Sequence, residues 1–127
     1  MIREVLLDTC TLLHILSGDE RIGLNKDLLL LLNNSKRYYS PLSIAEIAIK
    51  RSIGKLEIDD SYLNQIRLSG VEELSYSGEE AVLLENLPFH HKDPFDRMII
   101  ASALFRKIQI VTCDTVFKSY LPETILY

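Results

Sequence analysis

Four acidic residues occupy positions where side chains could cooperate in chemistry. Two of them follow apolar segments typical of buried strands, and two lie near the start of predicted helices. In open parallel sheets, ligands bind beyond the carboxyl ends of the strands, so these four positions should meet at one edge. Carboxylate ligands without His or Cys favour Mg²⁺ or Mn²⁺ over zinc. The acids are Asp8, Glu46, Asp96 and Asp114.

Each acid also has a simpler structural explanation. Asp8 and Asp114 could cap the helices that follow them. Glu46 could complete a capping box with Ser43, or it could pair with Lys50 four residues later. Taken singly, these acids are adequately explained as helix caps or surface ion pairs.

Taken together, the acids favour a metal site. Asp93 before Pro94 is typical of an N-cap, which places Asp96 in the first helical turn, where acids are common. However, Glu46 lies among Ile and Ala residues, and Asp96 precedes the apolar segment 98–101. Buried carboxylates are costly and repel one another, and a divalent cation would remove both costs.

Neighbouring polar residues are assigned supporting roles. Thr9 and Thr112 could hydrogen-bond a carboxylate or a metal-bound water. Arg97, adjacent to Asp96, is the preferred contact for a phosphate group. His90 and His91 do not fit the HExxH spacing of zinc enzymes and are expected to be solvated loop residues.

The order of the elements predicts an α/β fold. Strands are expected at 4–7, 38–40, 71–75, 108–112 and 124–127, and helices at 9–17, 24–34, 43–53, 59–69, from 77 to before Pro88, and 93–105. This alternation predicts a mostly parallel central sheet with helices on both faces, and the strand before Asp8 should lie in its middle. The five leucines Leu28 to Leu32 favour burial in the fold over a subunit contact, although both remain open.

Composition limits the possible classes of protein. The length of 127 residues predicts one domain over 1–127. The net charge of −4 argues against a broad basic face that binds nucleic acid. The first apolar run is too short for a signal peptide and no stretch could span a membrane, so we expect a cytoplasmic protein. Cys10 and Cys113 are expected to be small buried hydrophobes. GxxxxGK[ST], GxGxxG and GxSxG motifs are all missing from the sequence.

Four segments in this order resemble PIN-domain proteins, and most closely the VapC-type toxins of toxin–antitoxin pairs. They are Leu6-Leu7-Asp8-Thr9, Ser43 to Lys50, Asp93 to Arg97 with Ile100-Ala101, and Val111 to Asp114. The resemblance extends from about residue 3 to the C-terminus. It implies a parallel sheet flanked by helices, in agreement with the predicted elements.

The resemblance also implies a site and an activity. Asp8, Glu46, Asp96 and Asp114 would form the acidic metal site, and Asp93 matches a further acid of the same subgroup. The family's toxins are usually homodimeric, Mg²⁺-dependent endoribonucleases that cut structured RNA such as tRNA or rRNA and are inhibited by a small antitoxin. Cys10 departs from the Asn or His that is frequent at this position.

Three functions follow as hypotheses. The first is a Mg²⁺- or Mn²⁺-dependent endoribonuclease that hydrolyses RNA with a metal-activated water, as the toxin of such a pair. The second is a non-catalytic PIN-like module whose acidic groove receives a basic partner segment. A receiver-like phosphoacceptor domain is disfavoured, because Glu46 lies on a predicted helix and not at a strand end.

Overall fold

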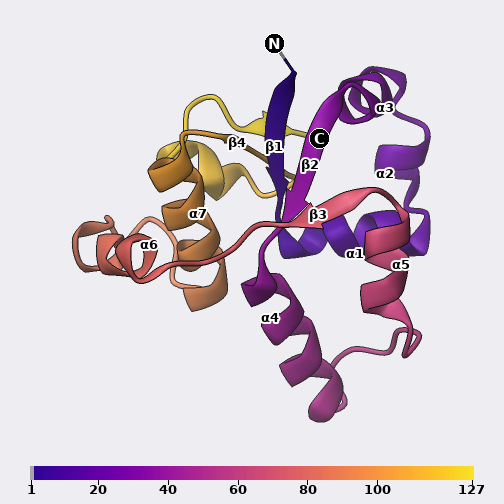
Figure 1. Ribbon diagram of the computed structural model, residues 1–127, viewed down its shortest axis with the longest axis horizontal. Helices are drawn as coiled ribbons and strands as arrows, with labels where there is room; N and C mark the ends of the chain where they lie inside the picture. The colour runs from indigo at the N-terminus through magenta and orange to yellow at the C-terminus, as the bar shows by residue number, and fades with distance from the viewer. Residues whose placement is uncertain (1) are drawn as a thin grey trace.

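A single parallel sheet organises the chain. The computed structural model describes residues 2–127. Its five strands lie in the order β3-β2-β1-β4-β5, every neighbouring pair is parallel, and β1 is central, as predicted (Figure 1). The strands are β1 (Arg3–Leu7), β2 (Ser35–Tyr39), β3 (Val71–Glu73), β4 (Gln109–Thr112) and β5 (Ile125–Leu126).

Helices connect the strands and cover both faces of the sheet (Figure 1). Within residues 2–127, none of these helices has the length and apolar character needed to cross a membrane. The α-helices are α1 (Thr9–Ser17), α2 (Glu20–Gly23), α3 (Lys26–Asn33), α4 (Pro41–Ser52), α5 (Tyr62–Leu68), α6 (Gly78–Val82) and α7 (Pro94–Arg106), and the 3₁₀ helices are η1 (Leu83–Asn86) and η2 (Thr115–Ser119).

The central strand β1 supplies two hydrophobic cores. Successive side chains of a strand point to opposite faces. Val5 and Leu7 therefore pack in a core with residues of α1, α2, α3 and α5, while Leu6 packs in a second core with residues of α7. The predicted α/β fold with helices on both faces is confirmed.

The leucine run of α3 is largely part of the first core. Leu28 and Leu32 are buried, and Leu29 and Leu31 pack partly against the same cluster. Leu30 is 65% exposed. Burial within the fold therefore accounts for most of this run.

The start of α4 differs from the prediction. Ser40 caps this helix by accepting the Leu42 N–H, and Pro41 occupies its first turn. Proline is preorganised for that position, so the helix begins before Ser43. Glu46 consequently lies in the second turn, and the predicted capping box with Ser43 is wrong.

A buried ion pair fixes the position of α7 against α6. The Glu80 side chain is fully buried, and its Oε1 accepts a 2.9 Å bond from Arg106 Nε. Glu80 also forms a capping box with Ser77. These contacts hold the C-terminal end of α7 against α6.

Candidate metal centre

Asp8 lies at the carboxyl end of β1 and is 2% exposed. Its Oδ1 accepts the Thr11 N–H at 2.9 Å and so caps α1. Its Oδ2 accepts a 2.5 Å bond from the Thr112 hydroxyl at the end of β4. Asp8 is therefore both a helix cap and a buried carboxylate at the carboxyl end of the central strand.

Thr112 connects Asp8 to the second strand-end acid. Its hydroxyl oxygen accepts the Asp114 N–H at 3.0 Å while its proton is donated to Asp8. The predicted bond from a threonine to a carboxylate thus forms at Thr112. At Thr9 it does not form, because that hydroxyl donates to the Ser43 hydroxyl at 2.9 Å and joins α1 to α4.

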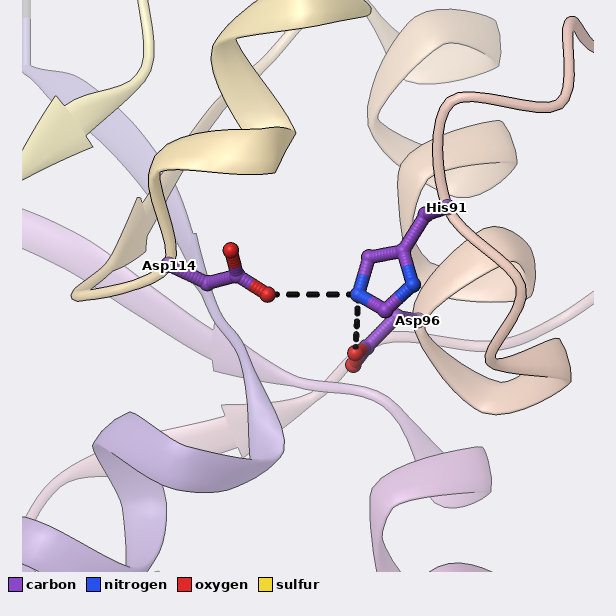
Figure 2. A group of neighbouring side chains, drawn as sticks. All are labelled: His91, Asp96 and Asp114. Carbon is purple, nitrogen blue, oxygen red and sulfur yellow. Dashed lines mark hydrogen bonds and ion pairs between the residues drawn. The ribbon is translucent and has the colours of Figure 1, made fainter.

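The N-terminus of α7 brings Asp96 to the same edge. Asp93 caps this helix by accepting the Asp96 N–H at 3.0 Å, as predicted. The Nε2 atom of His91 lies 2.9 Å from an Asp96 carboxylate oxygen and 3.2 Å from one of Asp114 (Figure 2). The His91 nitrogen and one carboxylate oxygen each from Asp96 and Asp114 all lie within 4.8 Å of one another.

The prediction that His91 is a solvated loop residue is wrong. Its side chain is only 18% exposed and points between the two carboxylates (Figure 2). By contrast, His90 is exposed, with its ring 5.0 Å from that of Tyr120. The sequence places both histidines just before the α7 cap, but only the loop conformation shows which one faces the acids.

Glu46 completes the acidic set from α4. It is 6% exposed, and its Oε2 accepts a 2.9 Å bond from Lys50 Nζ, so the ion-pair alternative is confirmed. Its Oε1 is buried and has no hydrogen-bond partner within residues 2–127. A buried, unpaired carboxylate oxygen is costly, and a cation would satisfy it.

The electrostatics show that the acids act on one another. Burial raises the pKa of Asp8, and the charge of Asp114 adds to this rise. Burial and the charge of Asp93 raise the pKa of Asp96 to about 7, with smaller contributions from Asp8 and Glu46. Carboxylates from four separate elements therefore share one electrostatic environment.

Arg97 does not have the predicted role. It is 7% exposed, and its guanidinium donates to the main-chain carbonyls of Leu87, Pro88 and His91. It also stacks on the Phe89 ring at 4.2 Å. These contacts use its donors inside the fold, so the guanidinium is not available to an RNA phosphate.

The cysteines also differ from the prediction. Cys10 is an exposed residue at the start of α1, and Cys113 is half-buried, so neither is a core residue. Although the residue is exposed, its thiol is partly shielded from water, and this desolvation together with the charge of Asp8 raises the pKa of Cys10 to about 11. The Cys10 thiol is therefore protonated at neutral pH.

The residues present fit a hard divalent cation. The raised pKa values of Asp8 and Asp96 and the unpartnered buried oxygen of Glu46 indicate an environment that a cation would stabilise. The candidate ligands are the predicted residues Asp8, Glu46, Asp96 and Asp114. Asp93 caps α7 through its Oδ1, and its charge adds to burial in raising the pKa of Asp96.

Several solved structures share the fold of this chain. VapBC2 from Rickettsia felis, solved with a DNA fragment from its promoter, matches with a TM-score of 0.71 at 20% identity, covering 98% of this chain and 97% of that chain. A toxin–antitoxin complex from Klebsiella pneumoniae has a TM-score of 0.66 at 17% identity, with 95% of each chain covered. DNA-bound VapBC from Salmonella typhimurium has a TM-score of 0.60 at 19% identity, with 98% and 97% covered. At these identities, the likeness shows a shared fold.

The sequence itself gives the family. No curated protein matches the chain. The PIN domain family matches it over residues 5–120, which include all the acids described above. The chain therefore belongs to the PIN domain family.

Proposed function

We propose that the protein is a Mg²⁺- or Mn²⁺-dependent endoribonuclease and the toxin of a toxin–antitoxin pair, acting on structured RNA such as tRNA or rRNA. The observation that carries this proposal is the buried, unpartnered Oε1 of Glu46, whose carboxylate adds to burial and to the charges of Asp93 and Asp8 in raising the pKa of Asp96. Membership of the PIN domain family and the likeness to toxin–antitoxin complexes support it.

The proposed roles follow from where the side chains lie. Asp8, Glu46, Asp96 and Asp114 would hold the cation, and Asp93 would add negative charge. Bound there, a divalent cation supplies Lewis-acid stabilisation of a phosphodiester and acidifies a water nucleophile. Thr112 holds the Asp8 carboxylate through its hydroxyl, and Thr9 supports the site through α4.

The proposed partners follow from the same comparisons. The neighbours from Rickettsia felis and Salmonella typhimurium were solved as VapBC assemblies bound to DNA. We propose a cognate antitoxin for this chain, a homodimer as its oligomeric state and the cytoplasm as its location. An antitoxin with a basic segment would complement the acidic edge of the sheet.

One observation favours a second candidate function, a non-catalytic module that binds a basic segment. Lys50 already places an ammonium group 2.9 Å from Glu46, so a basic side chain fits against these acids. The two functions differ in their need for metal. A binding module has no requirement for Mn²⁺ at the acids, whereas the nuclease must bind it.

RNA cleavage by the purified protein tests the proposal. The protein is incubated with total RNA in Mg²⁺ or Mn²⁺ and in EDTA, and the new 5′ ends are mapped. We expect cleavage only with metal, and its loss in Asp8→Ala with the fold intact. Asp27→Asn is the matched control, because Asp27 is an exposed acid on α3 and lies outside the candidate site.

Two results would contradict the nuclease. One is cleavage at the same rate by the wild type and Asp8→Ala in nuclease-free preparations. The other is a wild-type protein that binds neither Mg²⁺ nor Mn²⁺ but binds a basic peptide at the acids. That second result would favour the binding module.

A further inference from the structure

His91 is held in place on several sides by contacts outside the acidic group. Its main-chain N–H donates to the Tyr120 hydroxyl at 2.8 Å, and its carbonyl accepts a bond from Arg97. Its ring packs edge-on against the buried Phe117, with centroids 5.9 Å apart. The imidazole is therefore a fixed group and not a mobile loop side chain.

The main chain also selects the tautomer of this ring. The Nδ1 atom accepts the N–H of Asp93 at 3.2 Å, so Nδ1 must carry a lone pair. In the neutral ring the proton then lies on Nε2, the atom placed between Asp96 and Asp114 (Figure 2). His91 thus presents one N–H to carboxylates that come from two different elements.

His91 contacts one carboxylate oxygen of Asp114 and one of Asp96. The Oδ1 of Asp114 accepts the Val116 N–H, and its Oδ2 faces His91. The Nε2 contact of Asp96 uses its Oδ2, while its main-chain N–H is held by Asp93. One oxygen of each carboxylate is therefore oriented by His91, and a shared donor also reduces the repulsion between the two acids.

We propose that His91 is a positioning residue of the metal centre. Its Nε2–H donates to Asp114 and lies 2.9 Å from Asp96 Oδ2, and this contact keeps oxygens of the two carboxylates within 4.8 Å of one another, where both can serve one divalent cation. Hydrogen-bonding partners of ligating carboxylates typically contribute 10- to 100-fold to metal affinity. The inference rests on the proposed metal site, but it does not depend on RNA cleavage.

Two substitutions separate the donor from the packing of the ring. His91→Gln replaces the ring but keeps an amide N–H near the position of Nε2. His91→Phe keeps an aromatic ring against Phe117 and removes the donor. His90→Phe is the matched control, because the exposed His90 ring contacts Tyr120 and no acid of the site.

The measurement is the Kd for Mn²⁺ alone, obtained from the electron paramagnetic resonance signal of free Mn²⁺, with urea unfolding to confirm that each variant is folded. We expect His91→Phe to weaken Mn²⁺ binding by about tenfold. His91→Gln should retain most of the wild-type affinity, and His90→Phe should retain all of it.

Three results would overturn the inference. In the first, His91→Phe binds Mn²⁺ as tightly as the wild type or more tightly. In the second, His91→Gln loses as much affinity as His91→Phe, which would show that an N–H donor at this position does not preserve Mn²⁺ binding. In the third, the wild type binds no Mn²⁺, and the proposed metal-dependent function then fails as well.

Discussion

Asp8, Asp93 and Asp114 each cap a helix and also border the acidic site. In all three, the cap bond is accepted by a single oxygen, Oδ1, from a main-chain N–H two or three residues later. The second oxygen of Asp8 accepts from Thr112, and that of Asp114 faces His91. A cap therefore fixes the orientation of each carboxylate without excluding it from the site.

The raised pKa of Asp96 predicts a pH dependence of stability without metal. Burial and the charge of Asp93 raise this pKa to about 7. Between about pH 4 and about pH 7 the native carboxyl keeps a proton that the unfolded chain has released, so its contribution to stability is lost as the pH rises. We expect the Tm in EDTA to increase by several degrees when the buffer is lowered from about pH 8 to about pH 6.

The control for this prediction is Asp96→Asn, whose side chain does not titrate. Its Tm should vary less with pH over the same range, although Asp8 contributes a change of the same sign. A wild-type Tm that falls on acidification through this range, in parallel with Asp96→Asn, would contradict the assigned environment of Asp96.

The sequence predicted the position of a side chain correctly where the residue lies at the end of a strand. Asp8 and Asp114 could be placed because they lie within two residues of the ends of apolar strands. His91 could not, because a loop residue has no periodicity that shows which way its side chain points. Arg97 was misassigned because adjacency to Asp96 along a helix turns its side chain about 100° away, toward the protein interior.

At the scale of elements, the loop before α7 is supported by the buried Arg97. Its guanidinium donates to the carbonyls of Leu87, Pro88 and His91, so it joins the end of η1 to the residue that faces the acids. The N-terminus of α7 and the loop that carries His91 therefore form one structural unit.

Removing this guanidinium should destabilise the fold. Arg97→Met retains the aliphatic part of the side chain but leaves the buried carbonyls without donors. We expect this loss to lower the free energy of unfolding by about 2–4 kcal/mol. Urea unfolding measures the change, with the exposed Arg3→Met as control. Unchanged stability together with weaker RNA binding would restore the phosphate-contact role.

The elements themselves were predictable because strand and helix patterns alternate along the chain. Their boundaries were less so. The first turn of α4 was missed because Ser43 and Glu46 have the spacing of a capping box, whereas Ser40 and Pro41 provide the cap and first turn that form. The segment from 77 to before Pro88 was predicted as one helix, but it forms a short α6 followed by the 3₁₀ helix η1. The periodicity of apolar residues does not distinguish these two kinds of helix.

At the scale of the whole molecule, the sheet order brings distant acids together. β1 and β4 are neighbours although residues 8 and 112 are 104 positions apart, and the Thr112–Asp8 bond closes that distance. The sequence predicts a parallel sheet with β1 in its middle, but it does not specify which strands flank β1. That order depends on tertiary packing of the two cores.

Metal binding should therefore stabilise the entire fold. A ligand that binds only the native state at 100 times its Kd adds about 2.7 kcal/mol. We expect Mn²⁺ to raise the Tm of the wild type and of Asp27→Asn, and to have little effect on Glu46→Gln, which removes a charge from the site. Equal Mn²⁺ shifts in all three proteins would place binding outside the acids.

The most direct measurement is the anomalous scattering of Mn²⁺ in a crystal of the protein. The account predicts a peak bounded by the carboxylates of Asp8, Glu46, Asp96 and Asp114, with the His91 Nε2 atom against the last two. A peak elsewhere, with these carboxylates turned away from one another and unbound at saturating Mn²⁺, would contradict it.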